Sequence, residues 1–124
     1  MSRQYIKLYT ANIGDVVMIY FPFEEDSTKR KRRPAIVIGK KNGNIAVMIL
    51  KVTSHKVRSV YDYQITDVKS AGLHLGSVIR CNHVVKIRQN INCELRGHLG
   101  TYDITKCASL YMKAVRSNAV VQYK

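Results

Sequence analysis

The sequence predicts a mainly β fold in which a small β-barrel precedes one C-terminal α-helix. Two observations predict the barrel: short apolar segments of strand length recur between residues 14 and 87, and turn signals separate them. Among those signals, Asn42-Gly43 is typical of a two-residue hairpin turn, because both residues tolerate a positive φ. A third observation predicts the helix, since the apolar spacing becomes helical after residue 103.

Five segments are expected to form strands, and they span residues 16–21, 35–40, 45–52, 61–66 and 77–87. Gly14 leads into the first of them, and Pro22 ends it because proline cannot donate a ladder hydrogen bond. The second and third are expected to pair antiparallel through the Asn42-Gly43 turn. Their nearly continuous apolar runs indicate burial on both faces. The last strand is expected to bend near Asn82.

The remaining elements follow the strands or lie between them. Residues 71–73, Ala-Gly-Leu, predict a turn or a short helical piece, and the chain is expected to turn again over residues 97–100. Asp103 is expected to be the N-cap of the C-terminal helix. Residues 119–121 are expected to close the chain as a short edge strand. The apolar face of the helix is expected to comprise Ile104, Cys107, Ala108, Tyr111, Ala114 and Val115.

The size and charge of the chain limit its class and its partners. A length of 124 residues is typical of one domain, here spanning residues 1–124. The formal charge of +13, from 21 basic and 8 acidic residues, indicates an anionic partner, such as nucleic acid, an acidic protein or an anionic membrane surface. No apolar run approaches the roughly 20 residues of a membrane-spanning helix, so an integral membrane protein is not expected.

The cysteines and histidines give no sign of a metal site. Cys81, Cys93 and Cys107 are odd in number and widely spaced, and no C-x-x-C motif is present. This pattern predicts reduced thiols in a cytoplasmic protein and disfavours a zinc site. The four histidines do not stand at metal-ligand spacing either. No metal, no cofactor and no membrane partner are therefore expected.

A dense basic cluster precedes the second strand. It ends the polar loop that follows Pro22, and it consists of Lys29, Arg30, Lys31, Arg32 and Arg33. A rigid sheet can aim such a cluster at a phosphodiester backbone, where it would contact phosphates without choosing a sequence. Taken alone, Arg33 fits a solvated surface charge equally well. The acidic residues 24–26 of the same loop are interpreted either as a contribution to base selectivity or as a counterweight to the cations.

Six short motifs stand in order along residues 12–117. They are Gly14-Asp15-Val16-Val17, Arg32-Arg33-Pro34-Ala35-Ile36-Val37, Val52-Thr53-Ser54, Ala71-Gly72-Leu73, Ser77-Val78-Ile79-Arg80-Cys81 and Gly97-His98-Leu99-Gly100. In this order and at these spacings the chain resembles the MazF/PemK-type toxins of bacterial toxin–antitoxin systems. Each motif alone is a weak signal, whereas the ordered set is specific.

The resemblance implies a homodimeric SH3-like barrel that cuts single-stranded RNA without a metal. The ribose 2′-OH would be the nucleophile, and the products would carry 2′,3′-cyclic phosphate and 5′-hydroxyl ends. The family's catalytic pair corresponds to Arg33 and Thr53. An acidic antitoxin tail normally occupies the same groove and silences the enzyme, and operator DNA is a further partner through the toxin–antitoxin complex.

The chemistry of this cleavage identifies the residue types that it needs. A base must accept the 2′ proton, an acid must protonate the leaving 5′ oxygen, and a third group must stabilise the charged phosphorane. The planar guanidinium of Arg33 suits the third task, and it is a poor base because it stays protonated. The Thr53 hydroxyl can donate to a phosphate oxygen or orient the 2′-OH. Ser54 is a second donor, and Arg80 is a candidate second phosphate ligand.

The sequence leaves the general base open. Some relatives carry an aspartate two residues after the arginine of the fifth motif, and this chain has Asn82 there, which cannot accept a proton as a carboxylate does. His83 is the neighbouring candidate, because histidine titrates near neutrality. His55 is another candidate, since it follows Thr53 by two residues and would share its face on a strand. His55 and Asn82 are also expected to contact RNA.

Two other functions stay open from the sequence. The same fold includes toxins that bind gyrase, but those lack the basic residue before the proline, so Arg33, Thr53 and Arg80 together favour the nuclease. The other alternative is a basic barrel that binds nucleic acid without cutting it. Such a module would show a steep salt dependence of binding and would generate no new RNA ends.

Overall fold

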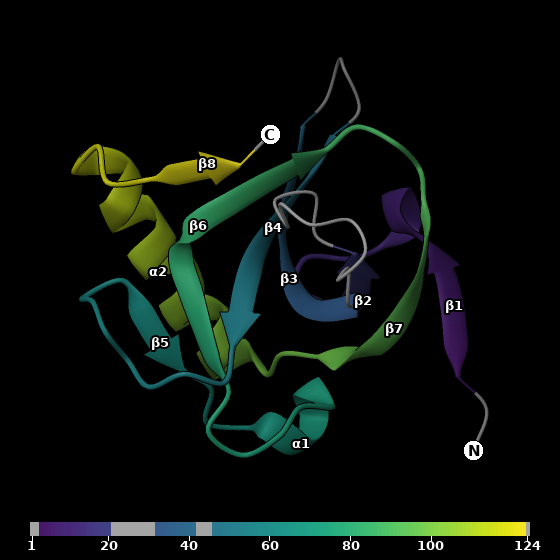
Figure 1. The fold of residues 1–124 in the computed structure, drawn as a ribbon, viewed down its shortest axis with the longest axis horizontal. Helices are drawn as coiled ribbons and strands as arrows, with labels where there is room; N and C mark the ends of the chain where they lie inside the picture. Colours follow the sequence, from purple (N-terminus) through teal and green to yellow (C-terminus); the bar gives the residue numbers. More distant parts are fainter. Residues whose placement is uncertain (1–2, 21–31, 42–45, 124) are drawn as a thin grey trace.

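Figure 1 shows the computed structural model of the chain, which describes residues 3–20, 32–41 and 46–123. The described residues form one strongly curved sheet and three helical segments. The strands are β1 (Gln4–Lys7), β2 (Asp15–Tyr20), β3 (Arg32–Lys41), β4 (Ala46–Thr53), β5 (Asp62–Gln64), β6 (Val78–Ile87), β7 (Asn92–His98) and β8 (Val121–Tyr123). The helical segments are η1 (Leu8–Thr10), α1 (Val68–Ala71) and α2 (Thr101–Arg116).

The strands are hydrogen-bonded in the order β1-β7-β2-β3-β4-β6-β5, and β8 pairs with β6 off this path. Every pairing is antiparallel except that of β6 with β8, which is parallel. The predicted mainly β class with a C-terminal helix is confirmed. Within the described residues the sheet is an open path rather than a closed ring, because β1 and β5 stand at its two ends.

The predicted antiparallel pairing of residues 35–40 with residues 45–52 is confirmed, with Ala35 opposite Lys51 and Val37 opposite Ile49. β3 begins at Arg32, three residues earlier than expected, because it also pairs with β2 as far as Tyr20. The Asn42-Gly43 turn lies outside the described residues.

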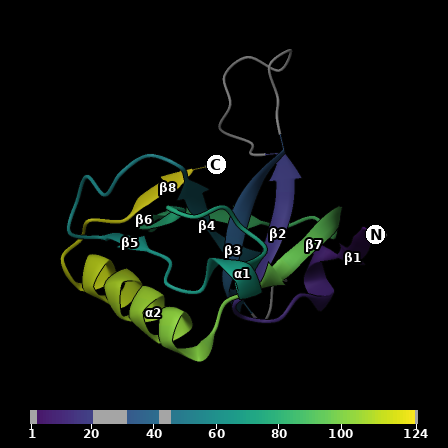
Figure 2. The ribbon, with the colours of Figure 1, turned by 90° about the horizontal axis from the view of Figure 1, so that it is seen from below.

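Both faces of the central strands are buried, as their continuous apolar runs predict. Neighbouring residues such as Val16 and Val17, or Ile49 and Leu50, belong to opposite faces because side chains alternate along a strand. One face packs a cluster that includes Leu8, Val17, Ile19, Val37, Ile49 and Val85. The other face packs a cluster that includes Val16, Ile36, Leu50, Ile79, Leu99 and Cys107, and α2 covers it (Figure 2).

The bend predicted near Asn82 is confirmed by the strand register. Leu50 of β4 is paired with Val84 of β6, whereas the next residue, Lys51, is paired with Arg80. Residues 81–83 therefore have no counterpart on β4, and β6 changes direction there (Figure 1). This bulge lets one half of β6 pair with β8 and the other half with β5.

The C-terminal helix differs from the prediction at its start. Gly100 is the N-cap, and Asp103 lies in the first turn, where its side chain is buried instead of capping the helix. The Asp103 carboxylate accepts hydrogen bonds from the Tyr63 hydroxyl, the Thr66 hydroxyl and the backbone N–H of Asp67. Asp103 thus joins α2 to the segment after β5. These hydrogen bonds satisfy the buried carboxylate, so it contributes more to stability there than it would as an exposed N-cap.

The two ends of the chain also differ from expectation. The last strand covers residues 121–123 rather than 119–121. On the predicted apolar face of α2, Cys107 and Ala114 are buried, whereas Val115 is 45% exposed. β1 and β7 form strands that the sequence patterns did not predict. Among the described residues, no helix has the length and apolar character needed to span a membrane.

The predicted turn at residues 71–73 starts at the last residue of α1 and contains its left-handed cap, Gly72, with φ of +68°. α1 lies directly on β7 at Gly97. A Cβ atom built on Gly97 would come within 2.5 Å of the Ser70 carbonyl oxygen and 2.6 Å of the Ala71 carbonyl oxygen. Only glycine allows this approach, so Gly97 fixes the distance between α1 and the sheet.

Candidate active site

A cavity of about 470 Å³ opens where β3 begins and β4 ends. Its walls come from three parts of the chain: the start of β3, the end of β4 with the residues that follow it, and the segment between α1 and β6. Its polar lining includes Arg33, Lys51, Thr53, Ser54, His55 and His74. Four of these six are residues that the sequence predicts for the site, and they come from two stretches of chain 20 residues apart, since 53 − 33 = 20.

Strand register explains why Arg33 and Thr53 meet. Ala35 pairs with Lys51, and continuing this antiparallel register by two residues sets Arg33 opposite Thr53. Residues that face each other in this way share one side of the sheet, and so do Lys51 and Thr53 on β4. On this side of the sheet, the residues around Ile49 are apolar and buried. Toward the cavity, the same side carries cationic and hydroxyl-bearing side chains instead.

The wall that follows β4 carries the hydroxyl groups and His55. Thr53 is half-buried, whereas Ser54 and His55 are exposed. The backbone N–H of His55 donates to Thr53 Oγ1 at 3.2 Å. A threonine hydroxyl can accept and donate at once, so this bond fixes Oγ1 and leaves its proton to be donated into the cavity.

A further wall is the segment between α1 and β6, which carries His74, Leu75 and Ser77. The backbone N–H and the hydroxyl of Ser77 both donate to the His74 carbonyl oxygen, at 3.2 and 2.7 Å, and hold the turn closed. Leu75 is 90% exposed at this wall. Reasoning from the sequence missed His74, because no spacing in the chain connects it with Thr53.

Sequence reasoning also missed Lys51. A signal for it was present, since a single lysine interrupts the apolar run from Val47 to Val52 at the residue that precedes the last buried position of β4. A charged residue within a central strand is costly unless it opens to solvent. The strand end at the cavity provides that opening.

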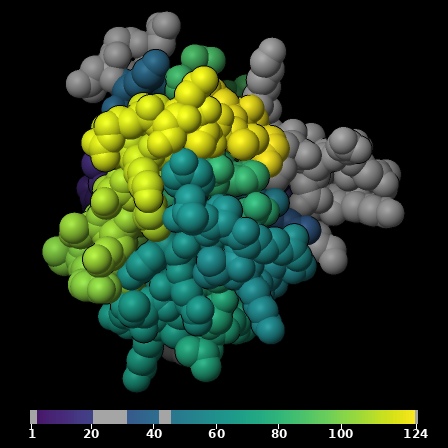
Figure 3. Space-filling view, turned by 90° about the vertical axis from the view of Figure 1, so that its left-hand side faces the viewer, coloured from purple at the N-terminus to yellow at the C-terminus, as the bar shows by residue number. Residues whose placement is uncertain are grey.

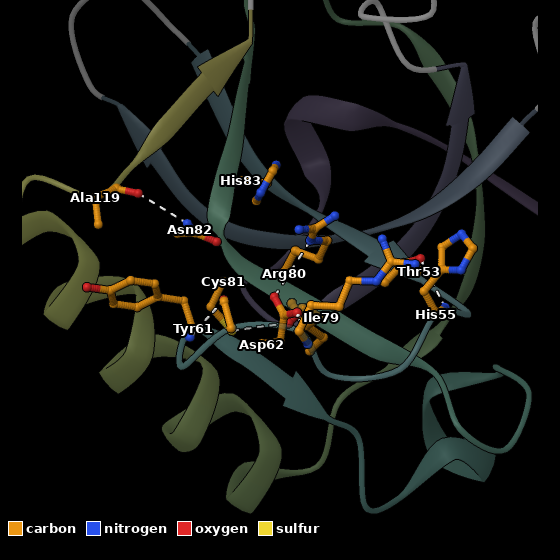
Figure 4. A network of polar contacts seen from close by, with 12 residues as sticks. Thr53, His55, Tyr61, Asp62, Ile79, Arg80, Cys81, Asn82, His83 and Ala119 are labelled. Atoms are coloured by element: carbon orange, nitrogen blue, oxygen red, sulfur yellow. Dashed lines mark hydrogen bonds and ion pairs between the residues drawn. The ribbon is translucent and has the colours of Figure 1, made fainter.

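Arg80 lies beside the cavity rather than in its lining. It pairs with Lys51 in the register of β4 and β6. Its Nε lies 3.6 Å from Oδ1 of the buried Asp62, and neither of these two atoms has a hydrogen-bond partner. The other oxygen, Oδ2, accepts from the backbone N–H of Arg58 at 2.9 Å. Asp62 therefore counterbalances Arg80 from the neighbouring strand β5, at the centre of the network in Figure 4.

Asn82 and His83 lie in the bulge of β6 and contact the C-terminal segment. Asn82 donates through Nδ2 to the carbonyl oxygen of Ala119 at 3.1 Å. His83 Nδ1 lies 2.8 Å from the Tyr123 hydroxyl, and the two rings stack. Burial, together with the charges of Arg80 and Lys51, lowers the pKa of His83. Figure 4 shows both residues on the far side of Arg80 from Thr53 and His55.

The basic cluster is described only at its last two residues, since residues 29–31 (Lys29, Arg30 and Lys31) lie outside the described part of the chain. Arg32 does not share the cavity with Arg33, because successive side chains of a strand point to opposite faces. Its guanidinium forms a 2.9 Å ion pair with the buried Glu94. The cavity thus receives Arg33 from this cluster and Lys51 from β4.

The lining of the cavity suits an anionic ligand. Two cations, Arg33 and Lys51, stand with hydroxyl donors and two histidines, and no carboxylate is among the lining residues that the structure describes. In those residues no group of three histidine, cysteine or carboxylate side chains is arranged to hold a metal ion. All three cysteines are buried free thiols. These side chains can therefore bind a phosphate and place hydroxyl and imidazole groups near it.

Residues 12–114 match one protein family, described as PemK-like, MazF-like toxin of type II toxin–antitoxin system. Similar folds occur in a MazF from Deinococcus radiodurans (14% identity, TM-score 0.62) and in an endoribonuclease in complex with its cognate antitoxin from Mycobacterial species (10% identity, TM-score 0.66). A MazE–MazF structure from Deinococcus radiodurans is also similar (13% identity, TM-score 0.63). Each comparison covers 86% of this chain and 96% of the other. No curated protein matches the chain. At such identities the structural likeness establishes the fold.

Proposed function

The chain belongs to the PemK-like, MazF-like toxin family, and from this premise we propose that it is an endoribonuclease that cuts single-stranded RNA. The observation that carries the proposal is the cavity in which Arg33 and Thr53 stand together. A phosphodiester is the anion that best uses a guanidinium, an ammonium and hydroxyl donors at the same site. The structural relative described as an endoribonuclease supports the same activity.

In this proposal the ribose 2′-oxygen attacks the adjacent phosphorus and the bond to the 5′-oxygen breaks. The products carry 2′,3′-cyclic phosphate and 5′-hydroxyl ends, and the reaction uses no metal. Arg33 binds two phosphate oxygens and stabilises the charge that develops on them. Thr53 donates a hydrogen bond to a phosphate oxygen or orients the 2′-OH, and Ser54 is a second donor.

Binding of the rest of the RNA follows from the charges around the cavity. Arg80 and Lys51, paired across β4 and β6, would hold a neighbouring phosphate. Lys29, Arg30 and Lys31 would hold the backbone beyond it, whereas Arg32 is paired with Glu94 on the other face of β3. The formal charge of +13 supports this electrostatic contribution, which salt should weaken.

We further propose an acidic antitoxin protein as the natural inhibitor. Two structural relatives are described with such a partner, one as an endoribonuclease with its cognate antitoxin and one as MazE–MazF. An acidic segment of the antitoxin would compete with RNA for Arg33 and Lys51. Within the same proposal the toxin is a cytoplasmic homodimer, and it reaches operator DNA through the antitoxin complex.

One observation favours a second candidate, RNA binding without cleavage. Residue 82 is an asparagine, and its amide is engaged by the carbonyl oxygen of Ala119. This position therefore supplies no carboxylate base. A protein with the phosphate-binding groups alone would retain RNA and leave it intact.

The test is cleavage of a long single-stranded RNA in excess EDTA, with the fragment ends mapped. Wild-type protein should give discrete fragments with 5′-hydroxyl ends, and Arg33→Ala should reduce kcat by about 10²–10³-fold while most of the RNA binding remains. Arg88→Ala is the matched control, because Arg88 is exposed and lies outside the cavity. Intact RNA that is nevertheless bound by wild-type protein would establish the second candidate.

A further inference from the structure

The lining residues that the structure describes include no carboxylate that could act as a base, but they include two histidines. Among its described lining residues, His55 and His74 are the side chains of a type that ordinarily titrates near neutral pH. The cationic side chains that line it are Arg33 from β3 and Lys51 from β4, and guanidinium and ammonium groups have hydrogen-bond donors but no acceptor. Proton transfer at this site therefore falls to imidazole groups.

The alternative bases of the described chain are engaged elsewhere. Asp62 is buried on β5, against Arg80 and the backbone N–H of Arg58. His83 is stacked on Tyr123 and bonded to its hydroxyl, and it is not among the residues that line the cavity. Neither group reaches a phosphate held by Arg33 without a rearrangement of its own contacts.

The two cavity histidines stand on different walls. His55 follows β4 and is tied to Thr53 through its backbone N–H. His74 belongs to the segment between α1 and β6, where Ser77 holds its carbonyl oxygen. Both side chains are exposed, so each imidazole can exchange protons with solvent between turnovers. Two imidazoles from different walls can serve two different oxygens of one phosphodiester, the 2′-oxygen and the 5′-oxygen.

We propose that His55 and His74 form the general acid–base pair of the cleavage reaction. This inference rests on the proposed function and deepens it, because it names the groups that move the two protons. One neutral imidazole takes the proton from the 2′-OH as the 2′-oxygen bonds to phosphorus. The other, as an imidazolium, gives its proton to the 5′-oxygen as the bond from phosphorus to that oxygen breaks. The two histidines end the step with their protonation states exchanged, and solvent restores them.

The first test is the pH dependence of kcat/KM for wild type, His55→Gln, His74→Gln and the double variant. The wild-type profile should be bell-shaped. Each single variant should lose one limb of the bell and lower kcat by about 10²–10⁴-fold. His98→Gln is the matched control, because His98 is exposed, contacts Asp15 and lies outside the cavity. Single variants that keep both limbs would overturn the proposal.

The second test separates the two roles with a chemically altered RNA in which sulfur replaces the bridging 5′-oxygen at the cleavage site. A thiolate leaves without a proton, so this substrate needs a base and no acid. The variant that lacks the acid should regain at least 10-fold of its lost rate, and the variant that lacks the base should not. Recovery of neither variant, or equal recovery of both, would contradict an acid–base pair.

A third measurement separates this proposal from the function on which it depends. An RNA with a single 2′-deoxyribose at the cleavage site cannot react, and both histidine variants should bind it within about twofold of wild type. If wild-type protein cleaves and the double histidine variant cleaves equally well, the pair is wrong and the nuclease stands. If wild-type protein does not cleave at all, the proposed nuclease activity is wrong, and so is the proposed acid–base pair.

Discussion

Arg33 on β3 and Thr53 on β4 line the same cavity, and the register of the two strands sets them opposite each other. A guanidinium and a hydroxyl so arranged can hold two oxygens of one phosphate from two directions. Their spacing depends on backbone hydrogen bonds between two central strands rather than on a loop. The pair is therefore as rigid as the sheet, which favours groups that must meet a transition state without rearranging.

Thr53→Val should separate the hydroxyl of Thr53 from its shape. Valine keeps the β-branched form that suits the end of a strand but cannot donate to a phosphate. We expect kcat to fall by about 10²-fold. The free energy of unfolding should fall by about 1 kcal/mol, because the N–H of His55 loses its acceptor. RNA cleavage kinetics and urea unfolding measure the two effects. Thr53→Ser, which keeps the hydroxyl, should retain most of the rate.

Lys51→Gln should weaken RNA binding in a way that salt reveals. The cavity loses one cation while the length of the side chain is nearly kept. For single-stranded RNA, the slope of log K against log salt should become less steep by about 0.7. Binding of a non-cleavable RNA at several salt concentrations measures this slope. Lys106→Gln on the exposed face of α2 is the control, and an equal change there would argue against a contact by Lys51.

Asp103→Asn should destabilise the fold by about 3 kcal/mol, because a buried carboxylate with several donors is replaced by an amide that also donates. Burial opposes ionisation of Asp103, but hydrogen bonds from Tyr63, Asp67 and Thr66 outweigh it and hold its pKa below the ordinary value of 3.8. A depressed folded pKa gives stability above the unfolded value that is lost as pH falls through the folded pKa.

Acid unfolding checks this sign. The free energy of unfolding of wild-type protein should decrease below about pH 4, and Asp103→Asn should show a smaller decrease over the same range. Tyr63→Phe removes one donor and should give an intermediate loss of stability at neutral pH. Equal pH slopes for wild type and Asp103→Asn would refute the role of this carboxylate in acid stability.

His83 should make the fold sensitive to mild acid. Burial and the charges of Arg80 and Lys51 lower its folded pKa, so the folded state favours the neutral ring. The corresponding stability is present above the unfolded pKa of about 6.5 and is lost as pH falls below it. The midpoint of thermal unfolding should therefore drop between about pH 7 and pH 5. His83→Gln should flatten this drop, and Lys106→Gln at an exposed site of α2 should not.

Much of the fold could be predicted because local patterns and long-range pairing agree in the centre of the sheet. The apolar runs at residues 35–40 and 45–52 predict buried strands, and the structure has β3 and β4 there. The bend predicted near Asn82 is the bulge of β6. β1 was missed because Gln4–Lys7 is largely exposed and becomes a strand by pairing with β7. The prediction for Asp103 is wrong because an acidic residue before a helical pattern predicts an N-cap. Its burial depends on Tyr63 and Thr66, which are not part of that local pattern.

The residues of the candidate site also differ in how far the sequence predicts them. Arg33 stands on one of the six ordered motifs, and Thr53, Ser54 and His55 stand on or directly after the next, so their order in the chain already groups them. His74 joins them only through the path of the chain after α1, and no local pattern encodes that path. Arg32 shows the opposite case, since its neighbour enters the cavity while its own side chain meets Glu94 on the other face.

The contact of α1 with Gly97 gives the two walls of the cavity different mechanical supports. The wall with Thr53 ends a central strand, so its amides should exchange with solvent only when the whole sheet opens. The wall with His74 belongs to the turn that follows α1, and its amides should exchange through local opening. The distance across the cavity can thus change over time while the sheet stays intact. A natural sequence can therefore adjust the width of the cavity through the segment after α1 without altering the central strands. Figure 3 shows the part of the chain between β4 and β6 in teal, beside α2 and β8 in yellow-green and yellow.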